Sequence, residues 1–128
     1  MTIRYTVSER PDLAAYQTLW TAAWNMPGPE HLRRLDHSLT WVCAYEDSRL
    51  IGFVNVAWDG GVHAFLLDTT VHPEYQRRGL GRELVRRAAG ESRQRGMHWL
   101  HVDFEPHLSD FYRGCGFRAT DAGLMRLN

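Results

Sequence analysis

Apolar and polar residues follow two rhythms along this chain, and each rhythm predicts its own kind of secondary structure. A period of two, or a continuous apolar run of strand length, predicts β-strands. Four polar residues join the stretch Thr40–Tyr45 to the stretch Leu50–Trp58, which predicts a hairpin. The predicted strands cover Ile3–Val7, Thr40–Tyr45, Leu50–Trp58, Val62–Val71 and Trp99–Phe104, and Phe117–Leu127 predicts one or two more.

Apolar residues three or four positions apart predict the helices. The first helix begins after Ser8, and Met26–Pro29 ends it and starts a short second helix that extends through Leu35. A third helix covers Gly79–Arg95 and a short fourth covers Leu108–Arg113. The apolar stripes are Leu13, Tyr16, Trp20, Ala23 and Trp24 on the first helix, and Leu80, Leu84, Val85 and Ala88 on the third.

The order of these elements, β-α-α-β-β-β-α-β-α-β, predicts an α/β fold with a mixed sheet. A strand–helix–strand unit favours a parallel pair, and the hairpins that flank it favour antiparallel ones. A chain of 128 residues has the size of one domain, so residues 1–128 are expected to form a single domain. Its 44% of hydrophobic and 23% of charged residues are typical of folded proteins.

Charge and cysteine content narrow the expected partners and compartment. Fifteen basic and fifteen acidic residues give a net charge of zero, so neither a nucleic acid nor a membrane is an expected partner. Cys43 and Cys115 are too few for a disulfide framework. Without a signal peptide or an apolar run as long as a membrane span, the chain is expected to be cytoplasmic.

The segment Val71–Arg82 is the most informative part of the sequence, because it joins a long strand to an amphipathic helix through two glycines. Gly79 and Gly81 have no Cβ atom, so a ligand can approach the backbone closely. The unpaired amides of a first helical turn carry partial positive charge, and they suit a pyrophosphate group. The alternative is that the glycines only shape the start of the helix.

Two familiar phosphate loops do not fit this segment. A Walker-type loop requires Gly-Lys-Ser/Thr, and here Arg82 and Glu83 follow Gly81. A dinucleotide fingerprint would need its third glycine at Leu84, which is too bulky for that packing. What remains is the spacing Gln76-x-x-Gly79-x-Gly81.

This spacing, between its strand and its helix, resembles the acetyl-CoA-binding motif of the GNAT superfamily of N-acetyltransferases. The resemblance implies that the loop amides hold the pyrophosphate of acetyl-CoA and that the end of the preceding strand binds the pantetheine arm through its backbone. The implied cofactor-binding residues are Thr69, Thr70, Val71, Gln76, Arg77, Arg78, Gly79, Leu80, Gly81 and Arg82.

A second motif, Phe111-Tyr112-x-x-x-Gly116-Phe117, resembles the same family. By this resemblance Tyr112 is the general acid that protonates the departing thiolate of CoA. The alternative is a half-buried aromatic residue with its hydroxyl at the rim. Many family members carry Asn seven residues and Ala four residues before this Tyr, where this chain has Glu105 and Leu108. Glu105 therefore serves as a base, binds an acceptor ammonium, or caps the next helix as a solvated carboxylate.

The general base is the open question of this sequence. Neutralising an alkylammonium at pH 7 costs about 4–5 kcal/mol, so a base is expected. Some family members carry a strand Glu at the position of Phe65 here, which leaves His63, two residues earlier on the same face, as a candidate. Asp68 and Asp103 are further candidates, either as bases or as structural hydrogen-bonding groups, and a water chain is another alternative.

Three other features carry weaker chemistry. His98 and His101 point to opposite faces of a strand, and no metal-binding spacing occurs, so no metal site is expected. Cys115 either packs as a small apolar residue or forms an acyl-enzyme. The stretch Trp24–Pro29 is where this family often builds its acceptor pocket, or its aromatic residues belong to the core.

The resemblance as a whole implies an N-acetyltransferase in which an amine attacks acetyl-CoA directly. The acceptor is a small-molecule amine or a peptide, and homodimers are common in the family. A non-catalytic CoA- or acyl-CoA-binding module is the main alternative, and a nucleotide- or phosphate-binding protein is the third.

Overall fold

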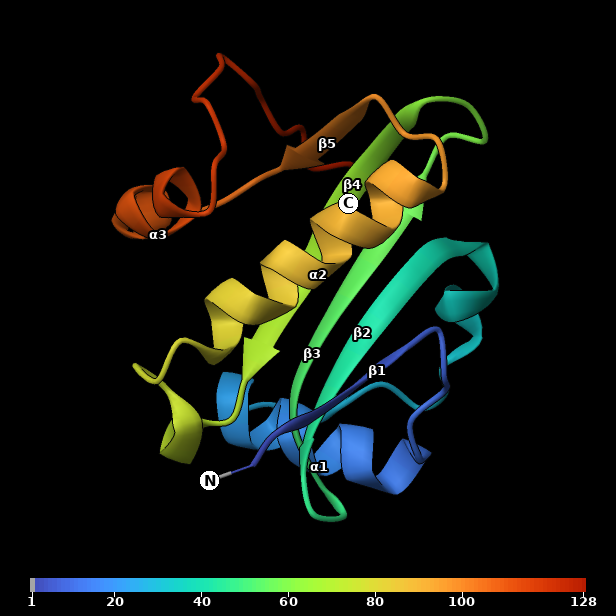
Figure 1. The fold of residues 1–128 in the computed structure, drawn as a ribbon, viewed down its shortest axis with the longest axis vertical. Helices are drawn as coiled ribbons and strands as arrows, with labels where there is room; N and C mark the ends of the chain where they lie inside the picture. Colours follow the sequence, from blue (N-terminus) through green and yellow to red (C-terminus); the bar gives the residue numbers. More distant parts are fainter. Residues whose placement is uncertain (1) are drawn as a thin grey trace.

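A five-stranded mixed sheet forms the centre of the computed structural model, which describes residues 2–128 (Figure 1). The strands follow one another across the sheet in chain order. All neighbours are antiparallel except β4 and β5, which are parallel, so the predicted mixed α/β sheet is confirmed. The strands are β1 (Arg4–Val7), β2 (Ser38–Glu46), β3 (Arg49–Trp58), β4 (His63–Val71) and β5 (Trp99–Val102).

Helix α2 (Leu80–Gln94) crosses one face of this sheet and supplies the connection between the two parallel strands. Its predicted apolar stripe is confirmed, because all four of its members are buried against the sheet. Burial of each larger apolar side chain contributes about 1.5–3 kcal/mol to stability. The buried residues of the stripe are Leu80, Leu84, Val85 and Ala88.

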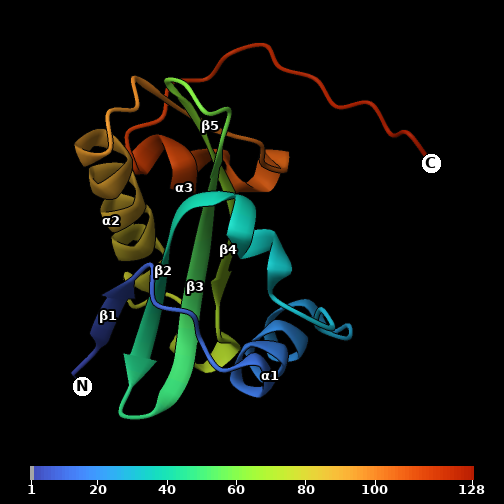
Figure 2. The same ribbon diagram turned by 90° about the vertical axis from the view of Figure 1, so that its right-hand side faces the viewer.

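Helix α1 (Leu13–Trp24) lies on the opposite face of the sheet, as Figure 2 shows. Asp12 caps its N-terminus, because its carboxylate accepts a hydrogen bond of 3.0 Å from the Ala15 amide. Tyr16 is buried against β3, whereas Trp24 at the end of the helix is 48% exposed. The last turn of α1 therefore presents an aromatic ring to solvent beside β4.

Two predicted elements differ in the structure. The second predicted helix is a 3₁₀ helix, η1 (Arg33–His37), because the few residues between Pro29 and β2 are too short to nucleate an α-helix. The predicted strands over Phe117–Leu127 are wrong, since residues 117–128 pair with no strand. Residues 119–123 are rich in Ala, Asp and Gly, which are poor strand formers. Figure 2 shows this tail leaving the domain.

The outer edge of β5 is consequently free of a paired strand. A groove of about 550 Å³ runs along this edge, between β5 and residues 116–122. Strand β5 ends at Val102 rather than at the predicted Phe104. Among residues 2–128, no helix combines the length and the apolar character that a bilayer crossing requires.

Candidate active site

Strands β4 and β5 lie side by side only over part of their length, and this leaves a gap with an unpaired strand edge. The parallel ladder joins His63–Leu66 to Trp99–Val102 and stops there. Strand β4 continues to Val71, and over its last residues it pairs with β3 alone. Backbone amides and carbonyls on the other edge of Thr69–Val71 are thus in position to bind an extended ligand. We call this region the β4–β5 cleft.

A bulge in β4 marks the point where the two strands separate. The ladder with β3 changes register between Phe53 and Asn55, opposite Asp68 and Thr69. Asp68 has a φ of 57°, in the left-handed region that Asp tolerates better than most residues. Because a bulge bends its strand and re-aims nearby side chains, it accounts for the divergence of β4 from β5.

In the loop between β4 and α2, both motif positions require glycine, but for different physical reasons. At position 79 glycine is required by the backbone, because its φ is 82°. A Cβ at that position would meet no atom within 4 Å. At position 81 glycine is required by packing, because a Cβ there would lie 3.3 Å from Cζ of Phe111. The space beside Gly79 is therefore open to a ligand, while Gly81 lets the Phe111 ring approach the first turn of α2.

Unpaired amides of the first turn of α2 follow directly after Gly79. The first hydrogen bond of α2 runs from the Glu83 amide to the Gly79 carbonyl at 3.0 Å, so the amides of Leu80, Gly81 and Arg82 have no partner within the helix. The side chain of Gln76 reaches back to the Val71 carbonyl at 3.5 Å. The predicted anion-binding set, which also includes Arg77 and Arg78, is contiguous along the loop.

Tyr112, on helix α3 (Ser109–Gly114), reaches the same cleft from the other side. Tyr112 is 7% exposed. Burial raises the pKa of Tyr112 above its ordinary value, and the side chain of Thr69 near its hydroxyl partly offsets this rise. The phenol is therefore protonated across the physiological pH range and lies against the strand edge that is free to bind a ligand.

Three phenylalanines fix the Tyr112 ring in place. The ring of Phe104 stacks on it with centroids 4.9 Å apart, and Phe111 and Phe117 meet it edge to face at 4.9 Å and 5.9 Å. Such aromatic pairs add about 0.5–1.5 kcal/mol each beyond the area they bury. A rigid ring aims its hydroxyl in one direction, as a proton donor needs.

Glu105 and His63, the two other candidate catalytic residues, lie in different parts of the fold. Glu105 follows β5 at the start of the 3₁₀ helix η3 (Pro106–Leu108), where its exposed side chain makes no capping hydrogen bond. His63 starts β4, six residues or about 20 Å along the strand from Thr69. Its ring nitrogen Nδ1 lies 2.8 Å from Nε2 of His101.

Apart from Asp68 at the bulge of β4, two candidates remain, Asp103 and Cys115. Asp103 follows the end of β5. Burial raises the pKa of the Cys115 thiol, whereas an acyl-accepting cysteine needs a lowered pKa. Among residues 2–128, no three His, Cys, Asp or Glu side chains form a group that could hold a metal ion.

Comparison with known families agrees with this geometry. Residues 12–117 match the model of the acetyltransferase (GNAT) family, which covers most of the chain. The chain belongs to the GNAT family. The match includes the glycine loop, the β4–β5 cleft and Tyr112, so the resemblance predicted from Gln76-x-x-Gly79-x-Gly81 is confirmed at the level of the family.

Among curated GNAT relatives, serotonin N-acetyltransferase 2, chloroplastic, of Oryza sativa subsp. japonica is 36% identical over 105 residues, which are 76% of this chain and 50% of the rice protein. GCN5-related N-acetyltransferase 2, chloroplastic, of Arabidopsis thaliana is 32% identical over 79 residues, which are 62% of this chain and 31% of that protein. The chain thus spans half or less of the length of these two relatives.

Solved GNAT structures share the whole fold. The acetyltransferase SP0256 of Streptococcus pneumoniae superposes with a TM-score of 0.80 at 26% identity, over 99% of this chain and 98% of that one. AAC(6')-Iy, solved in complex with the bisubstrate analogue CoA-S-monomethyl-acetylneamine, has a TM-score of 0.79 at 17% identity, over 100% of this chain and 99% of that one. The latter likeness concerns the fold alone.

One part of the site could not be found from the motifs. The sequence indicates neither the bulge at Asp68 nor the side chains that gather around it, because positive φ at a non-glycine residue leaves no pattern in the sequence. The hydrogen bond from Nε1 of Trp24 to Oγ1 of Thr70, at 3.3 Å, joins residues that are 46 positions apart. The sequence pointed toward this region only through Asp68 as a candidate base and through Trp24–Pro29 as an expected part of the acceptor pocket.

Proposed function

We propose that this GNAT domain transfers the acetyl group of acetyl-CoA to the nitrogen of an amine, which attacks the thioester directly in the β4–β5 cleft. The observation that carries this proposal is the convergence of three features on one place. The open anion site beside Gly79, the free strand edge of Thr69–Val71 and the hydroxyl of Tyr112 follow one another along the path of an extended ligand. That order matches the order of pyrophosphate, pantetheine and thioester in acetyl-CoA.

The residues fit acetyl-CoA on structural grounds. A pyrophosphate carries negative charge and accepts hydrogen bonds, which suits unpaired amides at the start of an α-helix and nearby guanidinium groups. Pantetheine contains two amide groups, and a free strand edge binds such groups as it would bind a neighbouring strand. The Walker and dinucleotide patterns fail at Arg82 and Leu84, which disfavours nucleotides without a pantetheine arm.

In this proposal Tyr112 donates its proton to the departing thiolate. A phenol of ordinary pKa about 10 is a weaker acid than a thiol of about 8.5, so the separate transfer is uphill by about 2 kcal/mol. Burial raises the pKa of Tyr112 and increases this cost. Proton transfer that is coupled to cleavage of the C–S bond removes most of the penalty. The fixed ring supports such coupling, because its three aromatic neighbours hold the phenol in one orientation.

An amine is the acceptor class that the relatives support. The rice relative is named a serotonin N-acetyltransferase, and AAC(6')-Iy was solved with a bisubstrate analogue that joins CoA to an acetylneamine. Those names describe those proteins, and N-acetylation is what the first of them states. We therefore propose an amine acceptor for this chain and leave its scaffold to experiment.

The test is release of free CoA thiol from acetyl-CoA across a panel of primary amines. Wild type is expected to release thiol with at least one amine, and Tyr112→Phe is expected to lose about 100-fold or more of that activity while still binding CoA. Tyr45→Phe, which removes a phenol hydroxyl on β2, is the matched control and should keep full activity. Tight CoA binding without release for any amine would favour the non-catalytic CoA-binding module instead.

A further inference from the structure

An ion pair on the α1 face of the sheet lies beside the β4–β5 cleft. The carboxylate of Asp68, at the bulge of β4, lies 2.9 Å from the guanidinium of Arg34, measured from Oδ2 to Nη1. The two side chains are 24% and 38% exposed. The closest contact of this pair is made through Oδ2 of Asp68. Arg34 thus holds the carboxylate in place through one of its two oxygens.

Arg34 is held more rigidly than an ordinary surface arginine. Its guanidinium carbon lies 5.7 Å and 5.4 Å from the ring centroids of Tyr16 and Trp20, and its Nη2 donates a hydrogen bond to the Tyr16 hydroxyl. Stacking and a directed hydrogen bond suit the planar guanidinium group. Arg34 therefore fixes the Asp68 carboxylate in one orientation.

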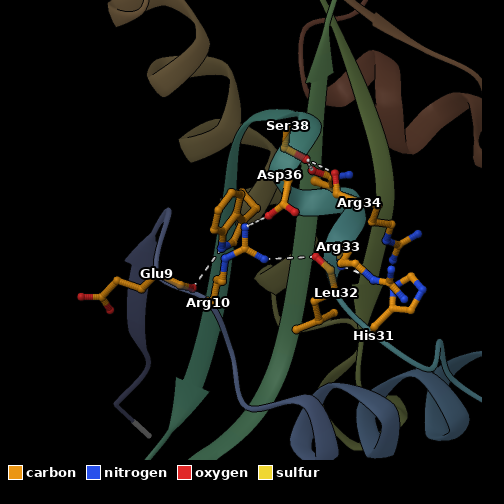
Figure 3. A network of polar contacts seen from close by, with 10 residues as sticks. Glu9, Arg10, His31, Leu32, Arg33, Arg34, Asp36 and Ser38 are labelled. Carbon is orange, nitrogen blue, oxygen red and sulfur yellow. Dashed lines mark hydrogen bonds and ion pairs between the residues drawn. The ribbon is translucent and has the colours of Figure 1, made fainter.

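The 3₁₀ helix η1 that carries Arg34 is itself tied to the rest of the fold (Figure 3). Arg10 donates a hydrogen bond of 3.1 Å to the Leu32 carbonyl and forms an ion pair with Asp36. Ser38, at the other end of η1, donates a hydrogen bond of 2.6 Å to Oδ1 of Asn55 on β3. Both ends of the segment are fixed, so the position of Arg34 does not depend on a bound ligand.

Exposed apolar side chains lie close to Asp68 through the fold or along the chain. Trp24 is 48% exposed, and its Nε1 donates to Thr70, whose hydroxyl in turn donates a hydrogen bond of 2.9 Å to the Asp68 carbonyl. Leu67, which precedes Asp68 on β4, is 41% exposed, and Met26, two residues after Trp24, is 53% exposed. A carboxylate in a region with exposed apolar side chains suits an amine that is carried on an apolar body.

We propose that Asp68 binds the acceptor amine and accepts its proton during acyl transfer, and that Arg34 positions the Asp68 carboxylate for this role. The acceptor class is then a primary amine on an aromatic or other apolar body. The inference rests on the proposed acetyltransferase function and names the acceptor side of the same site. Asp68 is next in the chain to Thr69, which contacts Tyr112, so the acceptor and the proton donor for the thiolate meet at the bulge.

The protons and bonds balance in this scheme. The acceptor ammonium first loses one proton to solvent, and the neutral nitrogen forms a bond to the thioester carbon. The nitrogen gains positive charge as this bond forms, and Oδ1 of Asp68 stabilises that charge and accepts the second proton. The C–S bond then breaks, and the thiolate takes the proton of Tyr112. The proton on Asp68 returns through solvent to the Tyr112 phenolate, and the products are an amide, CoA thiol and one released proton.

Burial supports this role, because it raises the pKa of Asp68 above its ordinary value, while the nearby Arg34 guanidinium partly offsets the rise. The titratable and charged groups that face Asp68 are Arg34 on η1 and Tyr16 on α1. Burial raises the pKa of Tyr16 to about 12, so this phenol stays neutral while Asp68 titrates. The charge on Asp68 is therefore the one that changes in the acid range.

The test uses the full chain and 2-phenylethylamine as the probe, with wild type and Asp68→Asn compared. Asn keeps the shape of the side chain and tolerates the left-handed backbone, so the fold is expected to survive. We expect kcat/KM for the amine to fall about 100-fold and the KM for acetyl-CoA to stay within about twofold. For wild type, the logarithm of kcat/KM plotted against pH should have a slope of one above the pKa of Asp68 and a slope of two below it. For Asp68→Asn, the slope should stay at one.

A control and a second readout keep the result decisive. Asp47→Asn makes the same change at an exposed turn with a similar φ of 52°, and it should behave as wild type. Calorimetric titration of the CoA-saturated protein with 2-phenylethylamine should show at least tenfold weaker binding for Asp68→Asn. If wild type binds 2-phenylethylamine but acylates no amine, and Asp68→Asn loses that binding, the transferase function is refuted while the Asp68 binding site stands. Equal binding and equal kcat/KM, or no binding to wild type, would overturn the Asp68 proposal.

Discussion

Replacement of Gly79 by alanine separates the two roles that a glycine can have at the head of α2. The backbone of Gly79 has a φ of 82°, where an L-residue costs about 1–2 kcal/mol. A Cβ at this position meets no protein atom within 4 Å, so no clash adds to that cost. The new methyl group would instead project into the space where we place the pyrophosphate of CoA.

Gly96, just beyond the other end of α2, offers a matched control. Its φ is 90°, and a Cβ there also meets no atom within 4 Å. Gly79→Ala and Gly96→Ala are therefore expected to lose the same stability, about 1–2 kcal/mol. For a domain of 128 residues this corresponds to a fall in Tm of about 4 °C for each kcal/mol.

The two variants should differ only when CoA is added. Calorimetric titration with CoA should show at least about tenfold weaker binding for Gly79→Ala, because the methyl group and the altered backbone both disturb the loop amides. Gly96→Ala should bind CoA as wild type does. Equal CoA affinity for all three proteins would refute the loop as the anion site, and equal weakening in both variants would attribute the loss to stability alone.

Two further predictions concern stability. Glu83 is hydrogen-bonded to Arg86 and Arg87, which lowers its pKa to about 2, so it stabilises the fold above about pH 4.5 and loses this effect as the pH falls toward 2. Glu83→Gln should therefore lower the free energy of unfolding by about 0.5–1 kcal/mol at pH 7 and have no effect near pH 2. Urea titrations at both pH values would measure this difference. An equal loss at both would contradict the ion pairs as the source of the stability. Ile51 is fully buried in the core between the sheet and α2. Ile51→Ala should cost about 2–5 kcal/mol in urea unfolding, and a cost below 1 kcal/mol would contradict the packing.

Local patterns were sufficient to predict most of the fold. The stripe on α2 and the hairpin of β2 and β3 depend on neighbours in the sequence, and both are confirmed. The last predicted strands failed because Leu124, Met125 and Leu127 have the apolar pattern of a strand, but no strand pairs with them. A strand needs a partner, and periodicity alone does not say whether a partner exists.

Part of the candidate site could likewise be predicted from the sequence and part could not. The family motifs predicted that the glycine loop and Tyr112 lie at the same cleft, because the family pattern encodes that long-range arrangement. The pairing of Asp68 with Arg34 depends on a bulge and on a 3₁₀ helix that carries no motif, so residues 34 positions apart met without a signal in the sequence. His63 had the right chemistry, but strand length places it about 20 Å from Thr69.

Whether the amine attacks the thioester directly is tested by initial rates measured while the concentrations of acetyl-CoA and the amine are varied together. Direct attack predicts intersecting double-reciprocal lines, an N-acetylated amine equal in amount to the free CoA, and no acetylated protein in the intact mass spectrum. Burial raises the pKa of the Cys115 thiol, so Cys115→Ala is expected to keep the same pattern. Parallel lines, together with an acetylated protein that disappears in Cys115→Ala, would instead establish an acyl-enzyme.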